Sequence, residues 1–273
     1  MIKKAGNTPL IRIKKLYKIF GLKNLYIKDE SRNPFGTYKD RRSELIIREA
    51  LRKKLDKLII ITSGNSGYSL ARCAEDTPLK VICVIDKNDK NSIKSKLKRC
   101  SYMVLETDLL KKKINPIDLI KEIRENEREK IKDVSNGFHS AYINIIREIK
   151  DEKPDYIIVP VGSGECFYGL YKGIKRYKLK TKLIGIGVKN KKESFADKLP
   201  TIWTPYQSNL NNLCKKGHKI IRLNEREIKI AYNKFKKLIN CEPSSAVALG
   251  VLYKIKFNKE DKIIIINSGR GVG

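Results

Sequence analysis

One lysine of the sequence directly follows a turn fixed by proline and glycine. Residues 33–43 read Asn-Pro-Phe-Gly-Thr-Tyr-Lys-Asp-Arg-Arg-Ser, and Lys39 stands at the start of a helical pattern over 38–54. A helix N-terminus and the neighbouring Arg41 and Arg42 disfavour a proton on the Lys39 amine. An unprotonated amine is a nucleophile, so this segment is a candidate for covalent chemistry. Solvent exposure is the alternative for any single lysine of so basic a chain.

A glycine-rich junction follows the apolar run at 156–161. Gly162, Ser163 and Gly164 separate this predicted strand from a helical pattern. Glycines let a backbone approach a ligand closely, and amides at a helix N-terminus bind anions such as phosphate. An ordinary tight turn is the alternative, because so short a motif has little specificity.

A second junction of small polar residues follows the apolar run at 57–62. It offers amides, hydroxyls and one carboxamide to a carboxylate or a heteroaromatic oxygen. Its members are Thr62, Ser63, Gly64, Asn65 and Ser66. On its own, this segment favours the alternative of simple helix capping.

The elements that must position these junctions alternate along the chain. Continuous apolar runs predict buried strands at 57–62, 80–85, 101–105, 156–161, 182–188 and 262–267. Helical patterns lie between them at 66–75, 117–132, 142–150, 225–238 and 244–253. This alternation predicts an α/β fold with open, mostly parallel sheets and helices on both faces. Ligands of such sheets gather at the carboxyl ends of the strands, so the three junctions can converge.

The order and spacing of these segments resemble those of fold type II pyridoxal-phosphate (PLP) enzymes, which include threonine synthase, cysteine synthase and threonine dehydratase. Residues 6–10, 242–246 and 266–271 extend the resemblance over nearly the whole chain. The resemblance implies a two-lobed fold that binds pyridoxal 5'-phosphate. Residues 1–43 and 136–273 would form the larger cofactor-binding lobe, and residues 44–135 the smaller, mobile lobe.

The resemblance also implies roles for individual residues toward the cofactor. Lys39 would hold it as a Schiff base and act as acid and base at the α-carbon. Asn65 would bind the ring hydroxyl, and Ser268 the pyridine nitrogen. A neutral partner leaves that nitrogen unprotonated, which suits elimination and replacement reactions. The phosphate would rest on the segment formed by Gly162, Ser163, Gly164, Glu165 and Cys166.

The small polar junction would receive the substrate. The resemblance implies that the carboxylate of an amino acid binds to Thr62, Ser63, Gly64 and Ser66. We therefore expect a small amino-acid substrate and a homodimer, as the resemblance suggests.

Three positions depart from the pattern that the resemblance leads us to expect. Glu165 and Cys166 replace a glycine and a threonine after the phosphate loop, and Arg42 stands where a small residue is common. A carboxylate beside a phosphate dianion must point away or be offset by a cation. These departures indicate a specialised member.

The residues beside Lys39 and those of the junction at 62–66 bear on the reaction. Asp40 after Lys39, and Ser66 after Asn65, argue against a dehydratase. Tyr38 resembles threonine synthase, so threonine synthase-like conversion of O-phosphohomoserine to threonine is slightly favoured. Residues 62–67 are closer to cysteine synthase, so β-replacement on an O-activated serine is the alternative. A non-catalytic, PLP-binding or scaffold relative is a further alternative, motivated by the residues after the phosphate loop.

Composition limits the remaining classes. The net charge of +30 is compatible with a nucleic-acid partner, but the lysines are spread along the chain without a nucleic-acid module, so we expect none. The six cysteines form no C-x-x-C pair and only two histidines are present, so we expect no metal. No apolar run has the length of a membrane span, and the N-terminus lacks the apolar stretch of a signal peptide. We expect no membrane association and a cytoplasmic location.

Overall fold

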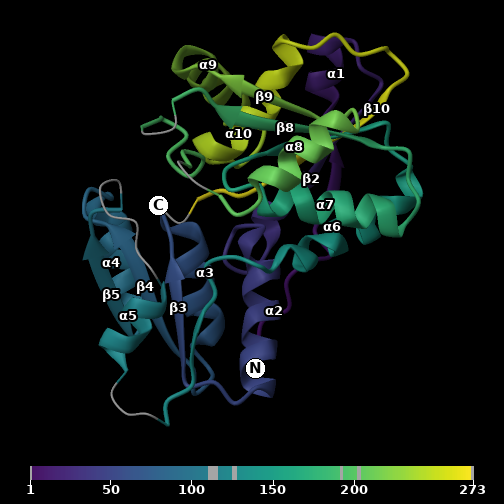
Figure 1. The fold of residues 1–273 in the computed structure, drawn as a ribbon. Helices are drawn as coiled ribbons and strands as arrows, with labels where there is room; N and C mark the ends of the chain where they lie inside the picture. Colours follow the sequence, from purple (N-terminus) through teal and green to yellow (C-terminus); the bar gives the residue numbers. More distant parts are fainter. Residues whose placement is uncertain (1, 110–115, 125–127, 191–192, 202–203, 272–273) are drawn as a thin grey trace. The chain divides into compact units, whose positions relative to one another are not determined.

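The computed structural model describes residues 2–109, 116–124, 128–190, 193–201 and 204–271, with the side chains of 116 and 117 left undescribed. The chain divides into two compact units (Figure 1). The small unit contains Lys39–Phe138 together with residues 2–5, and the large unit contains Gly6–Tyr38 and His139–Gly271. The lobe limits expected from the sequence fall a few residues away from these bounds, and remain a proposal about which part of the enzyme moves.

The large unit is built on a six-stranded sheet of the order β1-β2-β10-β7-β8-β9. Only β1 is antiparallel to its neighbour. The strands are β1 (Leu10–Arg12), β2 (Asn24–Asp29), β7 (Tyr156–Pro160), β8 (Lys182–Val188), β9 (Lys219–Leu223) and β10 (Lys262–Asn267). The central strands are continuous apolar runs because both faces of the sheet are covered.

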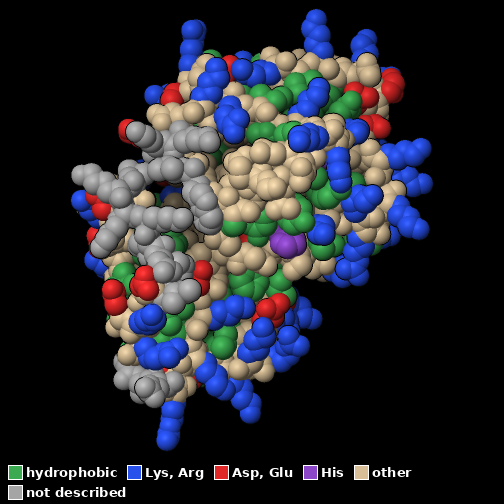
Figure 2. Space-filling model, in the orientation of Figure 1, with side chains coloured by type: hydrophobic (Ala, Val, Ile, Leu, Met, Phe, Trp, Pro, Cys, Tyr) green, Lys and Arg blue, Asp and Glu red, His purple; other side chains and the backbone are tan. Residues whose placement is uncertain are grey.

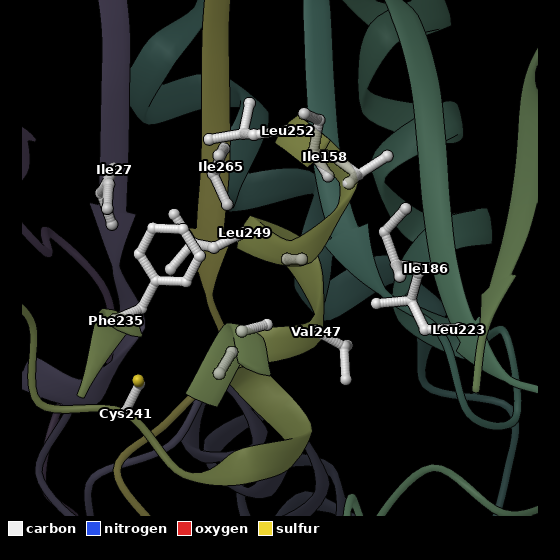
Figure 3. Packing of buried hydrophobic residues seen from close by; sticks show 14 of the residues in the cluster. Ile27, Ile158, Ile186, Leu223, Phe235, Cys241, Val247, Leu249, Leu252 and Ile265 are labelled. Atoms are coloured by element: carbon white, nitrogen blue, oxygen red, sulfur yellow. The ribbon is translucent and has the colours of Figure 1, made fainter. Parts of the chain in front are cut away.

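Successive residues of these strands point to opposite faces and build two cores. On one face, Ile158 and Ile265 pack against α9 (Glu225–Phe235) and α10 (Pro243–Gly250), as Figure 3 shows. On the other, Ile157 and Ile264 pack with residues of the helices that cover that face. These are α6 (Ile143–Ile149), α7 (Glu165–Arg176) and α8 (Gln207–Lys215). The unit also contains α1 (Lys14–Phe20) and short 3-10 turns at Glu30–Arg32, His139–Tyr142, Lys150–Glu152 and Val251–Tyr253.

The small unit has a four-stranded parallel sheet of the order β5-β4-β3-β6. Its strands are β3 (Lys57–Ile61), β4 (Lys80–Asp86), β5 (Met103–Thr107) and β6 (Ile131–Asp133). Its helices are α2 (Lys39–Arg52), α3 (Asn65–Ala74), α4 (Asn91–Cys100) and α5 (Pro116–Ile123). The Oγ atoms of Ser43 and Ser69 lie 2.8 Å apart, in a buried hydrogen bond that joins α2 to α3.

The predicted fold class is confirmed: both units are α/β with mostly parallel sheets. The helix predicted over 117–132 was wrong in its last residues, because α5 ends at Ile123 and Ile131–Asp133 forms β6. This three-residue strand is too short to give a periodic signal, and its pairing with β3 defines it. The strand predicted at 101–105 lies at 103–107, because Ser101 donates backbone and side-chain hydrogen bonds to Leu97 O at the end of α4.

The surface carries the basic excess of the composition. Figure 2 shows Lys and Arg side chains spread over the visible face, interspersed with acidic and uncharged atoms. None of the helices in the described part of the chain combines the length and apolar character needed to span a bilayer.

Candidate active site

The expected phosphate loop follows β7 in the large unit. Gly164 is the N-cap of α7 and has a φ of 88°, a conformation that favours glycine. A Cβ atom added to it would lie 2.7 Å from Leu210 Cδ1, so a larger residue here would force Leu210 to shift. Gly164 has no side chain that could cap the N-terminus of this 12-residue helix. The local geometry is therefore that of an anion-binding turn.

A segment far along the chain holds this loop. Thr204 Oγ1 donates a hydrogen bond to Ser163 O, and accepts one of 3.1 Å from Tyr206 N. A Cβ atom on Gly162 would lie 3.3 Å from the backbone oxygen of Lys198. These contacts could not be predicted from the sequence, because nothing in the local pattern of residues 198–206 distinguishes them from an ordinary loop.

Glu165, the first residue of α7, is 2% exposed. Tyr206 Oη donates a hydrogen bond of 3.1 Å to its Oε1 atom. Tyr206 packs in the core formed by α6, α7 and α8, so this bond draws a carboxylate oxygen toward that core. Burial lowers the pKa of the nearby His139, while the charge of Glu165 acts in the opposite direction. The ring of His139 lies 4.8 Å from that of Tyr168, centroid to centroid.

Ser268 follows β10, and the residue is 4% exposed. Its amide donates to Ser245 Oγ at 2.7 Å, and its carbonyl accepts from Tyr38 N at 2.9 Å. Ser245 Oγ in turn donates to Asn267 Oδ1 at 2.6 Å. The backbone of Ser268 is thus fixed, whereas its hydroxyl has no hydrogen-bond partner within the described residues. Such a hydroxyl is available to a ligand.

Ser268 and the glycine turn leave the same edge of the large unit's sheet. β10 and β7 are parallel neighbours, with Ile265 opposite Ile158, and the two segments follow their carboxyl ends. A cavity of about 180 Å³ lies beside Gly162 at this end of the sheet. Its described lining includes Gly187, Thr204, Gln207 and Arg222.

In the small unit, Lys39 is the first residue of α2 and is half-buried. The next four residues, Asp40, Arg41, Arg42 and Ser43, are all buried. Four consecutive polar or charged residues at the start of this helix are therefore buried, which is unusual.

Residues 62–66 lead into α3 in the same unit. Thr62 Oγ1 accepts hydrogen bonds from Gly64 N at 3.1 Å and Gly67 N at 3.0 Å, so its hydroxyl shapes the loop and caps the helix. Gly64 is the N-cap, with a φ of 124°, and Asn65 is 6% exposed. Ser63 is exposed and Ser66 is half-buried.

The structure thus brings the expected site residues together within each unit. Gly162, Ser163, Gly164, Glu165, Cys166 and Ser268 lie at one sheet edge of the large unit, and Lys39, Thr62, Ser63, Gly64, Asn65 and Ser66 lie around the starts of α2 and α3 in the small unit. Within the described residues, no group of three or more His, Cys, Asp or Glu side chains is arranged to hold a metal ion.

Comparison with known proteins identifies relatives along the whole chain. The threonine synthase of Methanocaldococcus jannaschii is 24% identical in an alignment 306 residues long, which covers 98% of this chain and 75% of the relative. The cysteine synthase of Helicobacter pylori is 27% identical, over 66% of this chain and 63% of the relative. The chain spans 49% of the threonine synthase of Halalkalibacterium halodurans, to which it is 26% identical.

Solved structures share the fold at lower identity. Maize serine racemase superposes with a TM-score of 0.81 at 18% identity, covering 98% of this chain and 89% of that one. Threonine deaminase isoform 2 of Solanum lycopersicum gives 0.79 at 18% identity, covering 98% and 84%. The family model described as "Pyridoxal-phosphate dependent enzyme" matches residues 2–269. Since that match spans almost every residue, the chain belongs to the family of pyridoxal-phosphate dependent enzymes, with pyridoxal 5'-phosphate as its cofactor.

Proposed function

We propose that this enzyme eliminates or replaces a group on the side chain of an amino acid, and that its reaction is threonine synthase-like, from O-phosphohomoserine to threonine. The observation that carries the proposal is the Ser268 hydroxyl, held by a fixed backbone and left without a partner in the described residues. A neutral hydroxyl at the pyridine nitrogen would leave that nitrogen unprotonated, which suits elimination and replacement.

The residues present fit the cofactor. The glycine turn at Gly164 and the start of α7 suit the phosphate, while the Glu165 carboxylate has a phenol donor in Tyr206. We assign the phosphate to Gly162, Ser163 and Gly164 with the amides of Glu165 and Cys166, the pyridine nitrogen to Ser268 and the ring hydroxyl to Asn65. Covalent attachment is assigned to Lys39.

When bound, PLP delocalises the negative charge that develops at the substrate α-carbon. The protein's own residues supply placement and proton transfer. The Lys39 amine would take and return the proton at the α-carbon. Thr62, Ser63, Gly64 and Ser66 would fix the substrate carboxylate.

The choice of reaction rests on two supports. The M. jannaschii threonine synthase aligns with nearly the whole chain, and Tyr38 before the lysine resembles that class. Cysteine synthase-like β-replacement on an O-activated serine is the second candidate, favoured by residues 62–67 and the H. pylori relative. A small amino-acid substrate, a homodimer, the division into lobes at 1–43 with 136–273 and 44–135, and a cytoplasmic location complete the proposal.

The decisive experiment is covalent mapping. Purified protein supplied with PLP is reduced with borohydride and digested, and the labelled peptide is sequenced. We expect the label on Lys39, loss of the visible absorption band in Lys39→Ala, and retention of the band in Lys53→Ala, a control just beyond the same helix. An unlabelled Lys39 in folded protein would refute the assignment.

Product assays then separate the two reactions. O-phosphohomoserine should yield phosphate and threonine, whereas O-acetylserine with sulfide should yield cysteine if the second candidate holds. A non-catalytic, PLP-binding or scaffold relative is a further candidate, motivated by Glu165 and Cys166 after the phosphate loop. A band that persists in Lys39→Ala, with no product from either substrate, would support that scaffold.

A further inference from the structure

Arg42 is a buried cation in the first turn of a helix. It is 1% exposed, and it lies three residues after Lys39 in α2. Enclosing a guanidinium is unfavourable unless hydrogen bonds and nearby charges compensate for lost water. A small side chain at this position would avoid the cost of burying a charge, so the contacts of Arg42 call for a functional explanation.

The guanidinium joins three parts of the small unit. Its Nη1 donates to Ser66 Oγ at 3.3 Å, at the start of α3. Its Nη2 donates to Val134 O, directly after β6, and Val134 N in turn donates to Ile59 O in β3 at 2.8 Å. The Phe138 ring centroid lies 5.4 Å from Arg42 Cζ. Arg42 therefore couples the polar loop to the sheet.

These contacts fix the direction in which Ser66 can donate. A guanidinium has only donors and remains charged at all accessible pH values, so Ser66 Oγ must be the acceptor. The hydroxyl hydrogen of Ser66 must then point away from Arg42. Within the described residues, the Ser66 hydroxyl donates no hydrogen bond, and the residue is half-buried. The loop thus presents a donor with a buried positive charge behind it.

We propose that Arg42 is a positioning residue for the substrate carboxylate. It turns the Ser66 hydroxyl outward as a donor and strengthens that donor by its charge, which suits the α-carboxylate of an amino acid. This inference rests on the proposed function, because it assigns the loop to an amino-acid substrate. It goes further in making recognition of the carboxylate depend on a side chain that lies beneath the loop.

A purely structural role for Arg42 predicts different results. As an anchor alone, it would contribute to the stability of the small unit and leave amino-acid binding unchanged once the protein is folded. Ser43→Ala is the matched control, because it removes a buried hydrogen bond between the same two helices, to Ser69, without touching the loop.

The experiment compares Arg42→Met, Arg42→Lys, Ser66→Ala, the Arg42→Met/Ser66→Ala double variant and Ser43→Ala in PLP-loaded protein. Affinity is measured from the change in the visible band during titration with O-phosphohomoserine or O-acetylserine, whichever amino acid changes the band. A second titration uses the α-carboxamide of that amino acid. Activity assays give KM and kcat, and thermal unfolding gives Tm.

We expect Arg42→Met and Ser66→Ala each to raise KM about tenfold or more, with kcat and the cofactor band little changed. The KM of the double variant should be no higher than that of the single variant with the higher KM, because Arg42 acts through Ser66. The preference for the carboxylate over the carboxamide should fall, and Arg42→Lys should recover part of it. Ser43→Ala should lower Tm and leave KM unchanged.

Two results would overturn the inference: an unchanged KM in Ser66→Ala, which keeps Arg42 and so keeps the fold, or Arg42→Met and Ser66→Ala effects that multiply. Ser66→Ala decides the matter even if Arg42→Met fails to fold. If wild-type protein lacks the cofactor band, or neither amino acid alters it, the proposed function fails and this inference falls with it. A normal wild-type response with unaffected variants refutes the inference alone.

Discussion

Two strand-to-helix junctions of this protein look alike locally but are stabilised in different ways. The turn before α7 and the turn before α3 each place a glycine with positive φ at the N-cap, Gly164 at 88° and Gly64 at 124°. The loop before α3 is closed by its own side chain, since Thr62 Oγ1 accepts from two amides of the loop. The loop before α7 is held from outside, by Thr204.

The charges behind the two junctions differ as well. Behind the α3 loop lies the Arg42 guanidinium, hydrogen-bonded to Ser66. At the start of α7 lies the Glu165 carboxylate, hydrogen-bonded to Tyr206. Both turns offer backbone amides to an anion, and the buried charge beside each turn strengthens or weakens that attraction. The first loop gains attraction from its cation, whereas the second depends on backbone amides.

The largest expected effect tests the glycine turn before α7. Gly164→Ala adds a Cβ atom 2.7 Å from Leu210 Cδ1 at a backbone angle that disfavours alanine. Strain and overpacking should together cost about 2–4 kcal/mol, and PLP affinity should fall sharply. Urea unfolding and PLP titration measure the two effects.

Gly21→Ala serves as the control for that variant. Gly21 also has a positive φ, of 67°, but nothing lies within 4 Å of its Cβ position. This variant should lose only about 1–2 kcal/mol, with PLP affinity unchanged. Equal losses in the two variants would show that packing at Gly164 has no special role.

An intermediate effect separates self-closure from external support. Thr62→Val removes the oxygen that two loop amides share, which should destabilise the small unit by about 1–3 kcal/mol and weaken amino-acid binding. Thr204→Val removes the donor to Ser163 O and should weaken PLP binding instead. Unfolding curves and separate titrations with PLP and the amino acid check this division. Both variants weakening the same ligand equally would contradict it.

The sequence predicted the elements that are continuous and apolar. The runs at 156–161, 182–188 and 262–267 correspond to β7, β8 and β10, because strands covered on both faces contain few polar residues. β2 was missed because Lys28 interrupts its pattern. That lysine is 2% exposed, and its amine lies 2.6 Å from Glu148, a carboxylate 120 residues away. No local pattern indicates that such a lysine is buried.

The candidate site, like the fold, was predictable where its residues form a local pattern and not where they depend on distant partners. The glycine turn, Lys39 and the departures at Arg42 and Glu165 are visible in the sequence, because they are local or depart from a family pattern. Their partners were not, because Tyr206 and Val134 reach Glu165 and Arg42 from distant segments of the chain. Residue type indicated where charge would be unusual, and only tertiary structure indicated how that charge is held.

The smallest expected effect concerns the Glu165 carboxylate at the start of α7. Burial, with a smaller contribution from Lys172, lowers the pKa of His139 below its ordinary value of 6.5, and Glu165 opposes this shift. The folded state therefore binds the proton less readily than the unfolded state, so stability falls as the pH drops below about 6.5 toward the folded pKa. Glu165→Gln removes the opposing charge, which lowers the pKa of His139 further and extends that loss to lower pH.

Unfolding by urea between pH 5 and 8 measures this pH dependence. We expect a greater loss of stability on acidification in Glu165→Gln than in wild-type protein. The contribution of His139 is isolated by comparing each protein with its own His139→Gln derivative, in which this histidine no longer titrates. Tyr206→Phe keeps the carboxylate charge near His139 and should leave the histidine's contribution almost as in wild type. A Tyr206→Phe profile that matched Glu165→Gln would mean that the phenol, and not the charge, sets the proton affinity of His139 beside this junction.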